Sequence, residues 1–236
     1  MLFRAGTAEL AESGALDGIT EYSKVLVDFF SGATNAVLEL KTKSDCIENL
    51  LDLNHRGKTS IAWSLNPPEI AVTEELYTAT PEERLKAAAV CAEYGYPIAF
   101  HFDPLIDYPG WEDGYHELVK SLFENVSPER VAWISLGALR MTPELHENMR
   151  KRFPLSRLPF GELIPSSDGK LRYFKTIRLT MYRKMIKWIE EYGGEVPVYL
   201  CMERPELWKR VFRRKPPEWS VINQQLVRRM LDMRTR

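Results

Sequence analysis

Charged side chains share one face of the predicted strand at residues 35–43. Side chains along a strand alternate between its two faces, so Glu39, Lys41 and Lys43 project to one side, opposite leucines. A lysine amine binds carboxylates and other anions, which makes both lysines candidates for the anionic end of a ligand. One of the two could equally be a solvated lysine at the strand end, and this interpretation is favoured for Lys41.

Two further predicted strands, at residues 59–66 and 97–103, carry the other candidate residues. Ser64 offers a hydroxyl near the polar end of the first, and His101 and Asp103 share a face at the end of the second. A histidine there could act as a general base or a ligand near neutral pH, or it could be a hydrogen-bonded interior residue. Asp103 could belong to a site, or it could only set the turn before the following proline.

Alternating strands and helices position these residues, a pattern typical of right-handed βαβ units and a parallel sheet. Helix starts support it, because Thr80 and Thr142 each precede a proline and Glu83 falls at a capping-box position. The stretch 153–171 is predicted to be loop-rich, with a turn at Asp168-Gly169. The predicted strands are 35–43, 59–66, 97–103, 131–139 and 196–202, with the stump of one more at 2–4, and the predicted helices are 44–54, 81–94, 111–125, 143 onward and 173–192.

The strand faces favour a barrel over a flat sheet. On several strands one face is apolar and the other is small or polar, with polarity rising toward the carboxyl end. A parallel sheet covered on both faces would instead show nearly continuous hydrophobic runs. A closed eight-unit barrel usually needs roughly 250 residues, and about five units do not close one. The fold class is therefore predicted to be α/β, as a partial barrel, an open sheet or a truncated form of a longer barrel.

The chain carries little net charge overall, but its C-terminal end is basic. The 236 residues include 32 basic and 33 acidic side chains, a net charge of −1, so no global field points to nucleic acid. Residues 204–236 hold ten Lys/Arg and three Asp/Glu, a local net of +7. This segment could contact phosphates or could be a solvated helical face. We therefore predict a barrel at residues 1–203 and a basic helical extension at residues 204–236.

Cysteine usage and hydropathy predict a cytoplasmic protein. Cys46, Cys91 and Cys201 are too widely spaced for a metal or redox motif and are expected to be free thiols in a reducing compartment. No apolar run of the sequence approaches the roughly 18 residues of a membrane span, so no membrane association is expected. The sequence also contains no phosphate-binding loop and no GxGxxG, HExxH or GxSxG motif.

Seven segments in chain order resemble the spore photoproduct lyase-like branch of the radical-SAM superfamily. They are ELKTKSD (39–45), WSLNP (63–67), ERLKAAAVCAEYGY (83–96), FHFDPLIDYPGWEDGY (100–115), WISLGALR (133–140), DGKLRYFKTIR (168–178) and YLCMER (199–204). The resemblance implies a partial six-unit (β/α) barrel of the radical-SAM type. It further implies S-adenosylmethionine (SAM) bound beside a [4Fe-4S] cluster held by CxxxCxxC, and a lyase that reverts thymine photodimers in DNA through a 5′-deoxyadenosyl radical.

The resemblance also implies cofactor-binding residues. Lys43 of KTKSD and Ser64 of WSLNP match positions that contact SAM in the family, and Asp103, with His101 beside it, stands on the same rim. Glu9 of GTAEL takes the place of the glutamate that binds the SAM ammonium in many radical-SAM proteins, although the preceding residue departs from the usual GTGE-type segment. No metal ligand is assigned within the chain, and the catalytic residues are left open.

Two departures from the family pattern keep alternatives open. The CxxxCxxC segment is absent and is expected to precede Met1, so the chain is predicted to be truncated, with a barrel edge at which a partner or second copy could associate. In photoproduct lyases a cysteine returns the hydrogen atom to the product radical, and Gly6 stands near that position here. The alternatives are a radical-SAM lyase-like enzyme, a SAM- or nucleotide-binding remnant without catalysis, a radical-SAM enzyme with a non-DNA substrate, and a nucleic-acid partner that uses its basic end.

Overall fold

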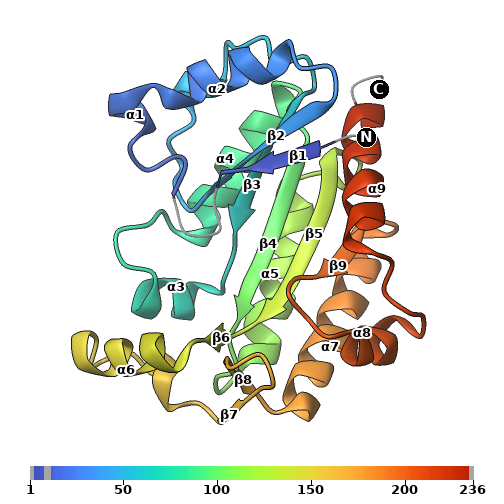
Figure 1. Cartoon of the computed structure of the whole chain (residues 1–236). Helices are drawn as coiled ribbons and strands as arrows, with labels where there is room; N and C mark the ends of the chain where they lie inside the picture. The colour runs from blue at the N-terminus through green and yellow to red at the C-terminus, as the bar shows by residue number, and fades with distance from the viewer. Residues whose placement is uncertain (1–2, 8–11, 234–236) are drawn as a thin grey trace.

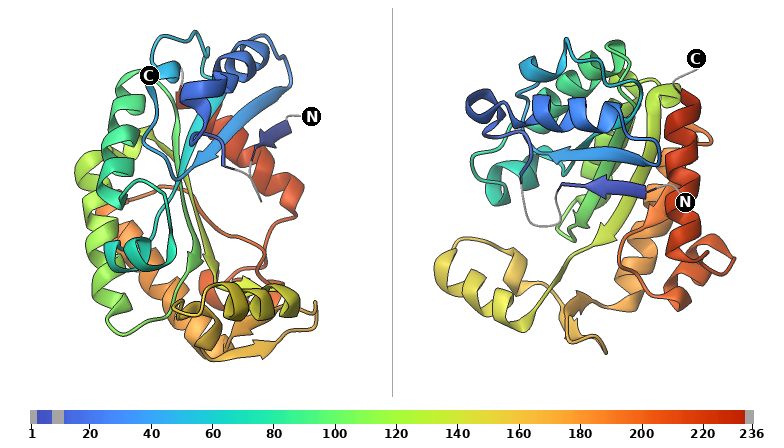
Figure 2. Two further views of the ribbon diagram at one scale, coloured as in Figure 1. Left: turned by 90° about the vertical axis from the view of Figure 1, so that its left-hand side faces the viewer. Right: turned by 45° about the horizontal axis from the view of Figure 1, so that its top comes forward.

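The computed structural model describes residues 3–7 and 12–233 of the chain (Figure 1). Its centre is a six-stranded sheet in which every neighbouring pair is parallel. The strands follow the chain in the order β1 (Phe3–Gly6), β2 (Ala36–Thr42), β3 (Thr59–Ser64), β4 (Ile98–Leu105), β5 (Val131–Ala138) and β9 (Val198–Leu200). The sheet curls into part of a barrel (Figure 2), which confirms the predicted α/β partial barrel and the predicted first strand.

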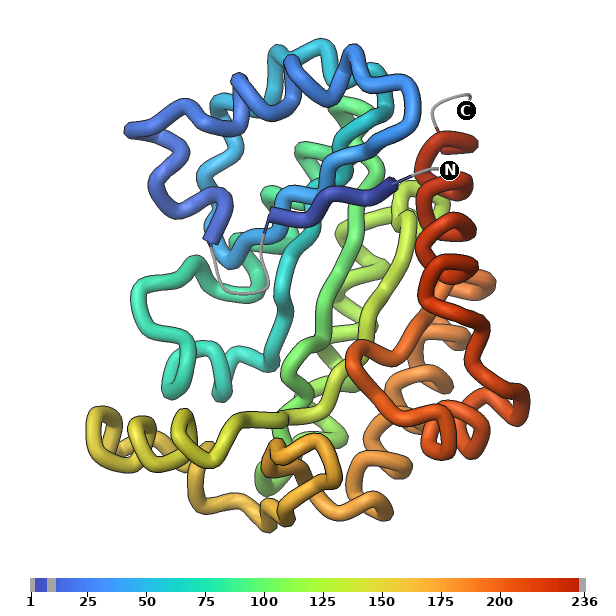
Figure 3. The backbone as a smooth tube through the Cα atoms, viewed as in Figure 1, coloured from blue at the N-terminus to red at the C-terminus, as the bar shows by residue number. Residues whose placement is uncertain are grey.

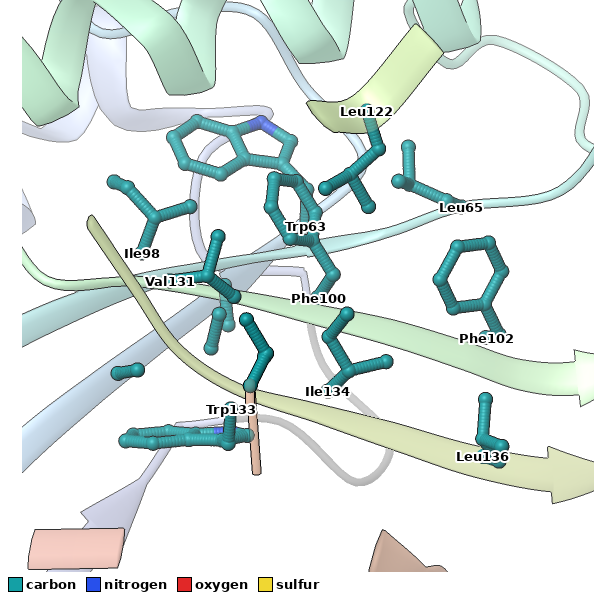
Figure 4. Close-up of a cluster of buried hydrophobic side chains, with 14 of the residues drawn as sticks. Trp63, Leu65, Ile98, Phe100, Phe102, Leu122, Val131, Trp133, Ile134 and Leu136 are labelled. Atoms are coloured by element: carbon teal, nitrogen blue, oxygen red, sulfur yellow. The ribbon is translucent and has the colours of Figure 1, made fainter. Parts of the chain in front are cut away.

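Helices cover the outer face of the sheet. Behind β3, β4 and β5 lie α4 (Pro81–Glu93), α5 (Trp111–Asn125) and α7 (Lys175–Gly193). The apolar strand positions pack beneath them: Phe100 projects to the same side as Leu122 of α5, whereas Trp133 projects to the opposite side (Figure 4). Alternate strand residues thus split into a helix-facing core and an inner face. The predicted capping box of α4 is present between Thr80 and Glu83.

The predicted helix at residues 44–54 is wrong. Only a single 3-10 turn, η1 (Glu48–Leu50), forms there. The hydroxyl of Ser44 accepts a hydrogen bond from the Cys46 amide, a local turn that competes with helix formation, and the Asn49 amide donates to the carbonyl of Asp17. The helix that packs against β2 comes before the strand instead: it is α2 (Tyr22–Ser31), preceded by the single turn α1 (Asp17–Thr20).

A small antiparallel sheet lies beyond the carboxyl ends of β4 and β5 (Figure 3). It has the order β6 (Arg140–Met141), β8 (Leu171–Tyr173), β7 (Leu163–Pro165). The predicted turn at Asp168-Gly169 is confirmed, since Gly169 has a φ of 78° in the connection between β7 and β8. Between β6 and β7 the chain forms α6 (Pro143–Arg152) and η3 (Leu158–Phe160). Earlier in the chain, α3 (Pro68–Glu74) follows β3 and η2 (Pro128–Arg130) precedes β5.

The C-terminal residues form two helices, α8 (Pro205–Phe212) and α9 (Trp219–Asp232). Helix α9 packs against β1 and β5 and lies beside β1 in both views (Figures 1 and 2). Its residues Leu226, Val227 and Met230 belong to the same hydrophobic core as the sheet. In the part of the chain that the structure describes, no helix combines the length and apolar character needed to cross a membrane.

Candidate functional site

A cavity of about 840 Å³ opens on the inner face of the sheet. This volume lies within the range of roughly 300–1,000 Å³ typical of small-molecule sites. Ligands of parallel α/β folds bind at the carboxyl ends of the strands. The strands contribute Arg4 and Gly6 of β1, Glu39 and Lys41 of β2, His101 and Asp103 of β4, and Tyr199 of β9, which Cys201 follows directly. Other elements contribute further lining residues, among them Arg140, Thr142, Leu145, Lys170, Trp219 and Asn223.

A buried chain of polar groups runs across the floor of the cavity. The His101 Nε2 lies 2.7 Å from Glu39 Oε1, and His101 Nδ1 lies 2.5 Å from Ser135 Oγ. Arg4 Nη1 adds an ion pair with Glu39 Oε2 at 3.3 Å. Because a carboxylate only accepts, the ring donates from Nε2 to Glu39 and accepts at Nδ1 from the Ser135 hydroxyl. The imidazole is thereby held as one neutral tautomer beside an ionised carboxylate.

The pKa directions agree with this assignment. Burial lowers the pKa of His101 and so favours the neutral ring, although Glu39 opposes the shift. Burial alone would raise the pKa of Glu39, but its interaction with His101 and the charges of Arg4 and Lys41 lower it to about 2. The carboxylate therefore stays charged at neutral pH even though its side chain is buried.

A second ion pair stands at the end of β4. Arg140 Nη1 and Nη2 contact Asp103 Oδ1 and Oδ2 at 2.7 and 3.2 Å, a two-point geometry. Burial would raise the pKa of Asp103, but the Arg140 contacts lower it. Burial and then Asp103 raise the pKa of the neighbouring Cys201 to about 12, so that thiol stays protonated. A Cβ at Gly137 would lie only 2.5 Å from Asp103 Oδ1, so this glycine makes room for the pair.

Replacing Gly137 by alanine is expected to lower the free energy of unfolding by about 1–3 kcal/mol, because the added methyl must displace the Asp103 carboxylate from Arg140. Urea unfolding at neutral pH measures it. Gly6→Ala is the matched control on the same inner face, where the new Cβ would meet Glu39 Oε2 at an ordinary 3.6 Å. Equal losses in the two variants would show that the Asp103 carboxylate does not need this space.

Lys41 is an unengaged cation that lines the cavity. It lines the cavity and lies close enough to influence Glu39, His101 and Asp103 electrostatically. Within residues 3–7 and 12–233, its amine makes no hydrogen bond or ion pair. An unengaged ammonium beside engaged carboxylates is suited to the anionic group of a ligand.

A polar network at the carboxyl ends of β2 and β3, which we call the rim network, joins two predicted site residues. Lys43 Nζ lies 2.9 Å from Glu75 Oε1, and the other oxygen of Glu75 lies 2.6 Å from Arg84 Nη2. Arg84, itself fully buried, donates through Nη1 to the carbonyl of Ser64 at 2.8 Å. Asn66 Nδ2 also donates to Glu75. Glu75 and Arg84 therefore hold Lys43 and the end of β3 in a fixed relation.

The predicted site residues thus fall into two groups. His101 and Asp103 line the cavity, whereas Lys43 and Ser64 meet in the rim network. Glu9 lies outside the described residues. Strand alternation placed the first four on the inner side of the sheet, but it gave no signal for the partners that fix them. Arg4, Arg140, Glu75 and Arg84 were missed, since each reaches its partner from another element.

The three cysteines do not form an iron–sulfur site. Cys46 is exposed in the loop after β2, Cys91 is buried in α4 and Cys201 follows β9. Over the described ranges, no group of three or more His, Cys, Asp or Glu side chains could hold a metal ion. These residues therefore do not fit a [4Fe-4S] cluster.

A parallel partial barrel with a polar cavity at the carboxyl ends of its strands defines a ligand-binding protein of the (β/α)-barrel class. The family model for spore photoproduct lyase matches residues 3–182, three quarters of the chain. The chain therefore belongs to the spore photoproduct lyase family, and the resemblance seen in its motifs is confirmed.

Individual relatives agree with this assignment. The chain is 29% identical over 150 residues to a spore photoproduct lyase of Bacillus subtilis (strain 168), covering 62% of this chain and 44% of that protein. It is 28% identical over 149 residues to that of Geobacillus sp. (strain Y412MC61), again covering 62% and 44%. The chain thus spans less than half the length of these relatives.

Solved structures give the same result. A spore photoproduct lyase mutant with bound AdoMet and dinucleoside spore photoproduct superposes with a TM-score of 0.76 at 25% identity, covering 84% of this chain and 61% of that one. A second mutant with the dinucleoside gives a TM-score of 0.77 at 26% identity over the same shares. The fold is therefore shared with these proteins.

Proposed function

We propose that this chain is the ligand-binding barrel of a radical-SAM lyase acting on thymine photoproducts, and that its cavity and rim network bind SAM and a nucleotide substrate. The observation that carries the proposal is the polar cavity at the carboxyl ends of the strands, in a chain of the spore photoproduct lyase family. Similar structures hold AdoMet and dinucleoside spore photoproduct. When bound, SAM supplies the hydrogen-abstracting chemistry of such enzymes.

The residues present are suited to SAM. Its carboxylate would contact Lys43, which Glu75 already orients at the rim, and its polar groups would contact the Ser64 hydroxyl. We assign its ammonium to Glu9 on the family resemblance. Asp103 and His101 complete the proposed cofactor-binding set from the cavity side.

The substrate would use the part of the cavity around Lys41. Lys41 would bind its anionic backbone, because this amine is unengaged by any described residue. Equilibrium dialysis of the chain with dinucleoside spore photoproduct and with unmodified thymidine dinucleotide tests the assignment. The proposal expects tighter binding of the photoproduct, and tighter still with SAM present. Equal weak retention of both compounds, unaffected by SAM, would contradict it.

A second candidate is a SAM- or nucleotide-binding protein without lyase activity, or a radical-SAM enzyme with a non-DNA substrate. It rests on Gly6, which stands where the resemblance places a hydrogen-donating cysteine, and on the dispersed cysteines. Anaerobic reconstitution with iron and sulfide tests whether this chain holds a cluster and cleaves SAM. We expect no cluster absorbance and no 5′-deoxyadenosine from this chain alone. Cluster absorbance with SAM cleavage would mean that its three cysteines supply a site.

The basic C-terminal helices are proposed to contact DNA outside the cavity. Lys209, Arg210, Arg213, Arg214 and Lys215 are all exposed at the end of α8 and in the loop after it. Lysines and arginines on such a surface bind phosphates and release counterions.

Replacing Arg213, Arg214 and Lys215 by glutamine is expected to weaken duplex DNA binding at 50 mM salt. The slope of log affinity against log salt should fall by about 1 for each lost phosphate contact. Fluorescence anisotropy over a salt series measures both. The matched control neutralises Arg150, Lys151 and Arg152, an equally charged exposed run on α6. Equal effects of the two triple variants, or salt-independent binding, would rule this surface out.

Self-association at the barrel edge is a further proposal. In the described ranges β1 pairs with β2 alone, so its other edge has no strand partner, and an unpaired edge can pair with another chain. Sedimentation velocity over a concentration series tests this. Free thiols fit a reducing compartment, so we also propose a cytoplasmic location.

A further inference from the structure

Helix α9 brings an aromatic ring and an amide to the cavity. Trp219 and Asn223 both line the cavity and lie four residues apart, on one face of the helix. The family model ends at residue 182, so this helix lies outside the segment that defines the family. The cavity therefore has one wall whose chemistry the family match does not describe.

Trp219 differs from the other tryptophans of the chain. Its exposed fraction is 54%, whereas Trp63, Trp133 and Trp208 are buried at 5% or less. The remaining two tryptophans are half-buried on α5 and α7. More than half of the Trp219 surface is therefore open at the edge of the cavity, where a ligand can reach the indole ring.

The Trp219 ring is nevertheless held in place. Its centre lies 5.6 Å from that of Tyr199, with the two rings at 63°, an edge-to-face contact. The guanidinium carbon of Arg4 lies 5.8 Å from the ring centre, close enough for a cation–π contact. Tyr199 and Arg4 line the same cavity. A rigidly supported ring loses little conformational entropy when a planar ligand stacks on it.

Asn223 supplies a side-chain amide on the same face of α9 as this ring. Throughout the described part of the chain, its side-chain amide forms no hydrogen bond. A carboxamide offers a donor and an acceptor together, the pair that matches the hydrogen-bonding edge of a nucleobase. Lys41 provides a cation for a phosphate or carboxylate in the same cavity.

We infer that Trp219 and Asn223 form a nucleobase-binding subsite, in which a base stacks on the indole ring and its edge hydrogen-bonds to the amide. The subsite deepens the proposed function and rests on it, since a nucleotide ligand must enter the cavity. The base is either a pyrimidine of the substrate or the adenine of SAM, because both have a planar π-face and a polar edge. The C-terminal helix thus becomes part of the ligand site.

The test titrates the full chain with thymidine dinucleotide and, separately, with SAM, by calorimetry. Trp219→Ala is expected to weaken binding of one of the two ligands by about 5- to 100-fold, the effect of losing one stacked base. Asn223→Ala should weaken the same ligand by about 3- to 30-fold. The ligand affected identifies the base. Val221→Ala and Gln225→Ala, exposed positions of α9 that do not line this cavity, should change binding less than twofold.

Trp219→Phe is the control for a folding defect in Trp219→Ala. It keeps an aromatic ring against Tyr199 and should retain most of the ligand binding. Quenching of Trp219 fluorescence by thymidine monophosphate, absent in Trp219→Phe, gives a readout that does not need SAM. If the chain binds a nucleotide only when Trp219 is present, but does not bind SAM, the subsite is supported and the proposed function is contradicted. SAM or dinucleotide binding that is unchanged in Trp219→Ala and Asn223→Ala would overturn the subsite alone, and a chain that binds no nucleobase compound would overturn both.

Discussion

Replacing Glu39 by glutamine is expected to lower the free energy of unfolding by about 3–5 kcal/mol. The substitution keeps the shape of the side chain but leaves the buried Arg4 guanidinium without its carboxylate, and breaking a buried pair by removing one partner has a cost of this size. It also removes the anionic acceptor of His101. Urea unfolding of the two proteins at pH 7 measures the difference. Glu93→Gln, an exposed position on α4, should change the value by no more than about 0.5 kcal/mol.

The same pair predicts how stability depends on pH. The pKa of Glu39 falls from an ordinary 4.5 to about 2 in the folded chain, so its contribution is complete above pH 4.5 and is lost as the pH falls toward 2. A shift of this size corresponds to about 3 kcal/mol. The pKa of His101 is also lowered, so loss of stability begins as the pH falls below the ordinary value of 6.5, where the unfolded state takes up the proton first. In Glu39→Gln, the loss of unfolding free energy between pH 4.5 and 2 should be absent. If this variant loses stability in that range as the unmodified chain does, Glu39 is not the titrating group.

Lys43→Met is expected to weaken SAM binding by about 10- to 100-fold. The variant removes a charged donor that Glu75 and Arg84 orient at the carboxyl end of β2, and a hydrogen bond to a charged group contributes about 1.5–3 kcal/mol. Lys41→Met should instead weaken thymidine dinucleotide and change SAM binding little. Calorimetric titration of both variants with both ligands separates the two lysines.

Lys86→Met provides the control for Lys43, because its amine is exposed and pairs with Glu82 on the surface of α4. It should bind SAM as the unmodified chain does. The opposite pattern, in which Lys41→Met loses SAM and Lys43→Met does not, would move the SAM carboxylate from the rim into the cavity. Glu75→Gln should have an intermediate effect, because it leaves the Lys43 amine in place without its orienting carboxylate.

The strand alternation in the sequence was enough to predict the inner face of the barrel. Glu39 and His101 were each placed on an inner face by period two alone, and the structure joins them at 2.7 Å across β3. The pattern could not pair them, because the curl of a sheet is a property of all its strands together. Arg4 was missed for the same reason, since its partner lies on the neighbouring strand.

Tertiary packing explains the other differences. The segment after Ser44 has helix-start residues, but local hydrogen bonds and the position of α2 over β2 remove any need for a return helix there. Glu75 follows α3 in an irregular connection, where no periodicity marks a residue as functional. In the C-terminal segment the sequence showed charge, whereas the structure shows an apolar face packed on β1 and β5 and an exposed indole at the cavity.

Calorimetric titration of the folded chain with SAM, in the absence of iron and sulfide, tests whether residues of this barrel bind SAM. We expect saturable binding at one site per chain, weakened at least tenfold in Lys43→Met and unchanged in Lys86→Met. A flat titration of protein that is folded by circular dichroism would contradict the claim that residues of this barrel bind SAM.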